Sequence, residues 1–325
     1  MKDEVMNYFR KLAGKDVDSQ TIADELTAIS LEDSDEFMST FAGDSFHHAG
    51  ANKTCTYFGD RLIYAMLKSK ETAKVALDQF NVKYGAEIVD YNDSLIAEGA
   101  CIAKVYSIFF ADKKYVELQQ RIKGEPVAIN SLKKVERAVA SRVEGLTEEE
   151  KIRVMGDEIY RFNHQQQELM KNLPQKAFDD LCKTILLLRD RKTRFYDNHC
   201  ENILVGKDSF TLIDLNYQKM LTDYKTKTQK PDLYDCIEDF LTPFSLSSML
   251  RKHLTVEQQK ALDKNNYQIA KKLVKALQNN NIPINLTDYR INMPFQDMLG
   301  ENYETYMQQI ATELQAEKAS PIKKV

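Results

Sequence analysis

Three oxygen-bearing side chains in the second half of the 325-residue chain have the types and spacing that could support chemistry. Asp197 lies on a predicted loop, Asn202 follows five residues later, and Asp214 comes after a further apolar run. Amide and carboxylate oxygens are hard ligands suited to Mg²⁺, which takes a few protein oxygens together with substrate phosphates. Asp197 could accept the proton of an attacking hydroxyl. Together these residues predict a Mg²⁺ site beside a general base.

A short β-hairpin is predicted to bring two of these side chains together. The apolar runs Ile203–Val205 and Phe210–Ile213 flank the polar turn Gly206–Ser209, a pattern typical of a hairpin. Folding this hairpin returns Asp214 toward Asn202. Asp and Asn are also common loop residues, so the alternative interpretation is a turn Asp and a capping Asn beside an ordinary hairpin.

The first half of the chain must supply the other elements around such a site. Residues 1 to about 40 have the apolar spacing of amphipathic helices, and residues 71 to 98 are helical in character with a break near Tyr84-Gly85. Two strand pairs are predicted, with a helix through 60–80 as the alternative to the second strand. The four strands are Thr54–Phe58, Arg61–Leu67, Ile102–Phe110 and Tyr115–Ile122.

The second half is predicted to be mostly helical. Thr147 and Glu150 form a capping box at the start of a helix that ends before Pro174. Apolar residues from Phe178 to Leu188 follow helical spacing, and the chain beyond 232 is helical in character. Strands early and helices late predict an α+β protein of two lobes, a small β-rich lobe and a helical one.

The order of these elements and the D-x4-N spacing resemble the protein-kinase superfamily. Glu201-Asn202-Ile203-Leu204 resembles the family's catalytic loop, and Leu212-Ile213-Asp214 resembles its metal-binding segment. The resemblance implies a bilobed kinase-like fold. Its parts would be a helical extension over 1–44, an N-lobe over 45–123, a C-lobe over 124–315 with an insertion at about 126–174, and a tail over 316–325.

The resemblance also implies residue roles. Lys68 would hold the α- and β-phosphates of ATP, Glu87 would orient Lys68 (Asp90 and Glu98 are alternatives), and Asp197 would be the base. Asn202 and Asp214 would bind Mg²⁺. The other implied ATP-binding residues are Gly50 in a phosphate-covering loop over 47–53, His199 beside the base, and Gln119, Gln120 and Arg121 in the linker between the lobes.

Several positions depart from the usual kinase pattern. Phe195 and Tyr196 replace the His and Arg before the base, and Leu215-Asn216 replaces Phe-Gly after Asp214. Without that Arg, control by a phosphorylated activation segment loses its charge partner. The chain therefore resembles a remote member, such as a bacterial effector kinase or atypical kinase. Lys225, Lys227 and Lys230 are a predicted contact for an anionic ligand or acidic partner, with a solvated surface as the alternative.

The implied activity is ATP- and Mg²⁺-dependent phosphoryl transfer to a hydroxyl. A protein Ser/Thr acceptor is the first expectation, and a lipid or other small-molecule hydroxyl is the alternative. A pseudokinase or binding module, AMP transfer on the same fold, and a helical scaffold unrelated to kinases are further alternatives.

Composition excludes other classes of function. The chain has 45 Lys+Arg and 49 Asp+Glu, for a net charge of −4, which gives no support to nucleic-acid binding. No window approaches the roughly 18 apolar residues of a membrane span. The start lacks an apolar signal core, and the five scattered cysteines are typical of free thiols. These features predict a cytoplasmic protein, and the sequence gives no sign either way on secretion as an effector.

Overall fold

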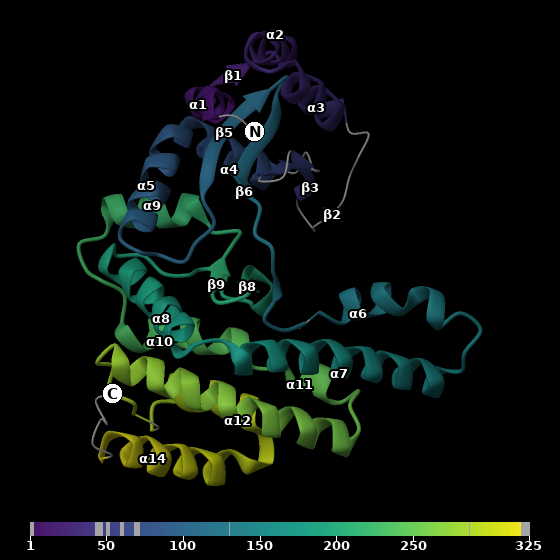
Figure 1. The fold of residues 1–325 in the computed structure, drawn as a ribbon, viewed down its shortest axis with the longest axis vertical. Coiled ribbons are helices and arrows are strands. Elements are labelled where there is room, and N and C mark those ends of the chain that lie inside the picture. The colour runs from purple at the N-terminus through teal and green to yellow at the C-terminus, as the bar shows by residue number, and fades with distance from the viewer. Residues whose placement is uncertain are drawn as a thin grey trace, which may run out of the picture. The chain divides into compact units, whose positions relative to one another are not determined.

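The structure, a computed structural model, combines many helices with two small sheets (Figure 1). It describes residues 3–42, 48–49, 53–58, 62–67, 72–129, 131–285 and 287–319. The chain divides into two compact units. The first comprises Met1–Lys123 and Asn216–Lys227, and the second comprises Gly124–Leu215 and Thr228–Val325.

A six-stranded sheet is the centre of the first unit. Its strand order is β1-β5-β6-β4-β3-β2, with β1 parallel to β5 and the other neighbours antiparallel. The strands are β1 (Asp16–Val17), β2 (His48–Ala49), β3 (Lys53–Phe58), β4 (Leu62–Leu67), β5 (Val105–Ala111) and β6 (Lys114–Gln120). Both predicted strand pairs are confirmed with ends shifted by a few residues, and the alternative of a helix through 60–80 is wrong for β4.

Six helices, counted over the described residues, complete the first unit. They are α1 (Asp3–Leu12), α2 (Ser19–Ile29), α3 (Leu31–Ala42), α4 (Thr72–Lys83), α5 (Gly85–Ala97) and α9 (Tyr217–Thr226). The predicted break near Tyr84-Gly85 is confirmed, and Gly85 shows its cause. A Cβ there would lie 2.5 Å from the Ile108 carbonyl oxygen and 2.7 Å from the Gly14 nitrogen, so α5 can begin against β5 only with a glycine.

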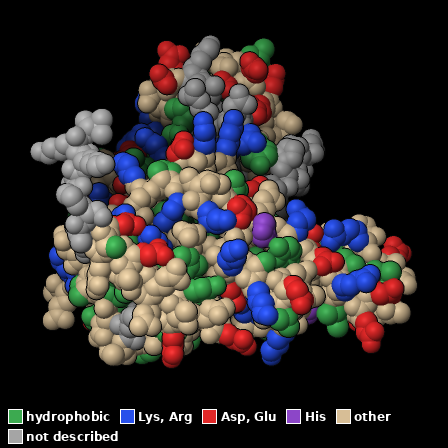
Figure 2. Space-filling model, turned by 60° about the horizontal axis from the view of Figure 1, so that its bottom comes forward, with side chains coloured by type: hydrophobic (Ala, Val, Ile, Leu, Met, Phe, Trp, Pro, Cys, Tyr) green, Lys and Arg blue, Asp and Glu red, His purple; other side chains and the backbone are tan. Residues whose placement is uncertain are grey.

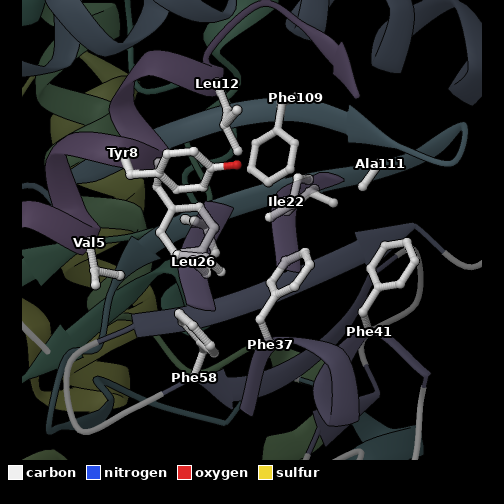
Figure 3. Close-up of a cluster of buried hydrophobic side chains, with 13 residues drawn as sticks. Val5, Tyr8, Leu12, Ile22, Leu26, Phe37, Phe41, Phe58, Phe109 and Ala111 are labelled. Atoms are coloured by element: carbon white, nitrogen blue, oxygen red, sulfur yellow. The ribbon is translucent and has the colours of Figure 1, made fainter. Parts of the chain in front are cut away.

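One face of this sheet is covered by the three N-terminal helices (Figure 3). Phe9 of α1 lies edge-on to Phe58 of β3, with ring centroids 5.5 Å apart at 87°. Val116 and Leu118 of β6 belong to the same buried cluster. Because side chains alternate along a strand, Tyr115, Glu117 and Gln119 lie on the opposite face.

The second unit is mostly helical and carries a three-stranded sheet of order β7-β8-β9. Its strands are β7 (Glu125–Pro126), β8 (Ile203–Val205) and β9 (Phe210–Leu212). Its α-helices are α6 (Leu132–Val139), α7 (Glu148–Asn172), α8 (Gln175–Asp190), α10 (Leu233–Leu241), α11 (Ser248–Arg251), α12 (Val256–Asn279), α13 (Tyr289–Leu299) and α14 (Tyr303–Ala319). Its 3₁₀ turns are η1 (Ala140–Arg142), η2 (Cys200–Asn202), η3 (Thr242–Phe244) and η4 (Gly300–Asn302).

The long helix α7 is held at both ends. The predicted capping box is confirmed, because Thr147 Oγ1 accepts from the Glu150 amide while Glu150 Oε2 accepts from the Thr147 amide. At the other end, Lys272 Nζ donates to the Lys171 carbonyl at 2.6 Å. A cation there satisfies terminal carbonyls and complements the helix dipole.

Helix α14 is joined to α12 by a carboxylate whose ionisation should control their contact. Glu313 accepts from Tyr267 Oη at 2.7 Å and from Lys271 Nζ at 2.9 Å. The bond from Lys271, then those from Tyr267 and Gln309, lower the pKa of Glu313 from 4.5 to about 2. A carboxyl with a lowered folded-state pKa contributes stability above its unfolded pKa, and the contribution disappears as pH falls through the folded value.

We therefore expect the contact between α12 and α14 to weaken as pH falls from about 4.5 to about 2. Amide hydrogen exchange within α14, measured across this range, checks the expectation. Glu313→Gln should raise exchange at neutral pH and flatten its dependence on pH in this window, whereas Glu304→Gln, at the exposed start of α14, serves as the control. An unchanged pH profile in Glu313→Gln would contradict the assignment.

Among the residues that the structure describes, none of the helices combines the length and apolar character needed to cross a membrane. Figure 2 shows Lys and Arg side chains interspersed with Asp and Glu over one face of the molecule. Positive and negative side chains that lie close together favour local ion pairs over an extended electrostatic potential of one sign.

Candidate active site

The β8–β9 hairpin brings Asn202 and Asp214 to one end of the small sheet, as predicted. Ile203 pairs with Leu212 in the antiparallel register, and the Ile213 amide donates to the Asn202 carbonyl at 2.9 Å. This last bond extends the register by one step, so the residue after Ile213 emerges beside Asn202. Strand pairing within the hairpin therefore brings Asn202 and Asp214 together, although they are 12 residues apart in the sequence.

Asn202 is buried, and its amide group holds the Asp197 loop. Its Nδ2 donates to the Asp197 carbonyl at 3.1 Å, and its backbone amide donates to the His199 carbonyl at 3.0 Å. An asparagine side chain whose NH₂ group is used in this way presents its Oδ1 as the atom that can bind a cation. Asn202 therefore orders the Asp197 loop through its NH₂ group, and this use is compatible with metal binding through Oδ1.

Asp197 and His199 lie side by side on this loop, each with 48% of its side chain exposed. His199 Nε2 is 3.4 Å from Asp197 Oδ1, and the His199 amide donates to the Asp197 carbonyl at 2.9 Å. Half-exposed groups can reach a substrate hydroxyl or a phosphate from solvent. Asp197 therefore has the accessibility that a general base needs.

Asp214 occupies an unusual backbone conformation. Its φ is 51°, in the left-handed region that few residues other than glycine adopt, although Asp is among those that tolerate it. Its side chain is exposed at the end of the hairpin. Such conformations persist when the surrounding structure requires them and are common at functional sites.

A partly buried ion pair, which sequence reasoning missed, supports the Asp197 loop. Arg194 donates through Nε and Nη2 to the two carboxylate oxygens of Asp239 at 2.8 and 2.9 Å. Asn198 Nδ2 also donates to Asp239, at 2.9 Å. Burial raises the pKa of Asp239, and the bonds from Arg194 oppose that rise. A signal was present in the sequence: Asp239 lies among the buried apolar residues of α10, where a charge requires a partner.

Two further residues, Glu201 and Cys200, lie on the same loop. Glu201 forms a 2.6 Å ion pair with Lys134 of α6. Burial raises the pKa of the Cys200 thiol to about 12, so this thiol stays protonated and does not serve as a nucleophile. The oxygen-bearing residues are thus the chemically competent part of the loop.

In the first unit, Glu87 has a different partner from the one implied by the kinase resemblance. It forms an ion pair with Lys225 of α9 and has 51% of its side chain exposed. Lys225 also lies over the Tyr84 ring, 4.6 Å from its centroid. Asp90, an alternative to Glu87, pairs with Arg10 at 2.9 Å. Lys68 and Gly50 lie outside the described residues, so their roles stay predictions.

A buried carboxylate in the sheet was also missed by sequence reasoning. Glu117 of β6 is 2% exposed, accepts from Tyr115 Oη at 2.8 Å and accepts from Gln119 Nε2. It pairs in register with Ala65 of β4, the strand that leads to Lys68. Alternation of polar Glu117 and Gln119 with apolar Val116 and Leu118 was the available signal, because it predicts one polar face.

The predicted linker residues make contacts within the first unit. Gln119 donates to Glu117 as described, and Gln120 Oε1 accepts from the Lys104 amide at 3.3 Å. The Arg121 guanidinium lies 3.7 Å from the centroid of the Tyr57 ring. These contacts order the end of β6, and nucleotide binding by the three residues stays a prediction.

The expected binding of an anionic ligand by three lysines is not supported. Each lysine has a carboxylate partner within the chain: Lys225 pairs with Glu87, Lys227 with Asp223 at 2.7 Å, and Lys230 with Asp190 at 2.8 Å. Most of each positive charge is balanced locally, which weakens attraction for an external anion.

The segment after Asp214 forms helix α9 of the first unit, where Tyr217 Oη accepts from Asn92 Nδ2 at 3.1 Å.

The donor set fits Mg²⁺ held together with nucleotide phosphates. Within the described ranges, no group of three or more His, Cys, Asp and Glu side chains is arranged to hold a metal ion. Mg²⁺ bound with a nucleotide needs only one or two protein oxygens, the phosphates and water supplying the rest. Asn202 Oδ1 and the Asp214 carboxylate meet that requirement by type and by their shared position at the hairpin end.

The chain has remote likeness to solved phosphotransferases. No protein-family model matches the sequence, and no curated protein matches it. Among solved structures it is similar to the GDP and kanamycin complex of APH(2")-IIia, with 12% identity, a TM-score of 0.26 and coverage of 87% of this chain and 99% of that chain. The GDP complex of wild-type aminoglycoside 2'-phosphotransferase-IIIa gives 11% identity, a TM-score of 0.26 and the same coverage. A likeness at this level carries no argument about fold or function, so the assignment of function depends on the chain's own residues.

Proposed function

We propose that the chain is an ATP- and Mg²⁺-dependent phosphotransferase that acts on a hydroxyl. The observation that carries the proposal is the bond from the Ile213 amide to the Asn202 carbonyl, because it brings two Mg²⁺-type oxygen ligands to one hairpin end. The same asparagine holds the loop that carries Asp197. A base and a metal-ligand pair fixed in one local structure suit phosphoryl transfer, which depends on positioning and charge neutralisation.

Each residue then has a defined task. Asp197 accepts the proton of the attacking hydroxyl, and the neighbouring His199 contacts a phosphate oxygen. Asn202 and Asp214 would hold Mg²⁺, which when bound neutralises charge on the phosphates. Lys68 would contact the α- and β-phosphates, and Glu87 would orient Lys68 after releasing Lys225.

The acceptor we propose is a Ser or Thr hydroxyl of a protein. Asp197 is half-exposed, which suits an acceptor presented on a protein surface. A lipid or other small-molecule hydroxyl is the alternative acceptor and would use the same residues.

Nucleotide binding followed by product analysis tests the proposal. We expect ATP to bind more tightly with Mg²⁺ than without it, and mass spectrometry to find phosphate on Ser or Thr of a protein panel. Lys68→Met should weaken both binding and transfer. Transfer only to lipids or metabolites would overturn the acceptor, and AMP transfer or no transfer in the folded protein would overturn the activity.

A further inference from the structure

A second arginine of the helical unit is linked to the Asp197 loop through shared carboxylates. Arg290, at the start of α13, lies 2.8 Å from Asp232 and 2.9 Å from Asp235 through Nη1. Its Nη2 lies 2.8 Å from Asp288, and its guanidinium lies over the Tyr234 ring. Only 21% of its side chain is exposed. A planar guanidinium group that contacts this many partners has little freedom to move.

Asp235 connects the two arginines. Its Oδ1 accepts from Arg290, and its Oδ2 accepts from Arg194 Nη1 at 3.1 Å. Arg194 also donates to the Asp235 carbonyl at 3.1 Å. Arg194 and Asn198 both bond to Asp239, and Asn198 adjoins Asp197. A continuous series of charge-assisted hydrogen bonds therefore runs from α13 to the loop of the proposed base.

We propose that Arg290 is a positioning residue for Asp197. This inference rests on the proposed function. Arg290 holds the Asp235 carboxylate in place, and Asp235 in turn holds one side of the Arg194 guanidinium. The orientation in which Arg194 bonds to Asp239 therefore depends on Arg290. Networks of this kind behave as units, so a change at one end alters geometry at the other.

Arg251 provides a matched control for this series. It donates to Asp263 at 2.8 Å and through Nη2 to the carbonyls of Asp297 and Met298 at the other end of α13. Each arginine therefore pairs with a carboxylate and ties α13 to another helix. Only Arg290 shares Asp235 with Arg194.

The test compares Arg290→Gln, the milder Arg290→Lys and Arg251→Gln below their melting temperatures. We expect Arg290→Gln to lower kcat roughly tenfold with the nucleotide KM unchanged, since small displacements of a reacting group are costly. Amide hydrogen exchange over residues 194–199 should rise several-fold in the same variant. Arg290→Lys should have a smaller effect on both, and Arg251→Gln should lower the melting temperature while leaving kcat and this exchange unchanged.

Asp235→Asn completes the test as a double-mutant cycle. The double variant Arg290→Gln/Asp235→Asn should lose little more kcat than the more impaired single variant, because both changes interrupt one series. Unchanged exchange over 194–199 in Arg290→Gln, or fully additive losses, would overturn the proposal. If the wild-type chain transfers no phosphate, the proposed function fails, while the exchange measurement still decides whether Arg290 orders the loop.

Discussion

Replacing Asp214 with alanine is expected to abolish Mg²⁺-dependent phosphoryl transfer and to leave the fold intact. Asp214 is exposed at the hairpin end beside Asn202 and lies outside the hydrophobic core. Removing a metal ligand removes charge neutralisation in the transition state, worth about 4 kcal/mol or roughly a thousandfold in rate. Initial rates of transfer at saturating ATP measure the loss, and circular dichroism checks the fold.

Two further variants separate the carboxylate from the backbone. Asp214 has a φ of 51°, so alanine adds strain that glycine would not. Asp214→Gly should therefore be as inactive as Asp214→Ala and at least as stable. Asp208→Ala, in the exposed turn at the other end of the same hairpin, should keep wild-type turnover. Undiminished Mg²⁺-dependent turnover in folded Asp214→Ala would rule out the metal assignment.

The second large effect concerns stability. Arg194→Met should lower the free energy of unfolding by about 3–5 kcal/mol, because it leaves a buried carboxylate without its charge partner. The Asp239 side chain is only 4% exposed, and burial already raises its pKa. Urea denaturation measures the change. Arg10→Met should cost less than about 1 kcal/mol, because 43% of the Arg10 side chain is exposed and its more buried partner, Asp93, also pairs with Lys104.

The same pair offers a check on mechanism. Replacing both partners, as Arg194→Met/Asp239→Leu, should recover part of the lost stability, since the penalty of an unpaired buried charge is gone. It should not recover transfer activity, because Asn198 also loses its bond to Asp239. Equal stability losses in Arg194→Met and Arg10→Met would show that burial of Asp239 does not govern the energetics.

Four strands of the larger sheet, the start of helix α7 and the β8–β9 hairpin could be predicted from the sequence because their causes are local. The hairpin follows from two apolar runs around Gly206–Ser209, and helix α7 begins at the capping box of Thr147. Turn chemistry, capping and side-chain periodicity act over a few residues. For the same reason, Asn202 and Asp214 could be predicted to lie together.

The choice of ionic partners was decided by tertiary structure. Glu87 pairs with Lys225, 138 residues away, and Arg194 pairs with Asp239, 45 residues away. The chain has 45 basic and 49 acidic residues, and exposed pairs differ little in energy. The sequence alone therefore determined local elements and the position of the candidate metal ligands. Packing of distant helices and strands decided which charges are buried and which carboxylate each cation meets, because desolvation and distance set the energy of an ion pair.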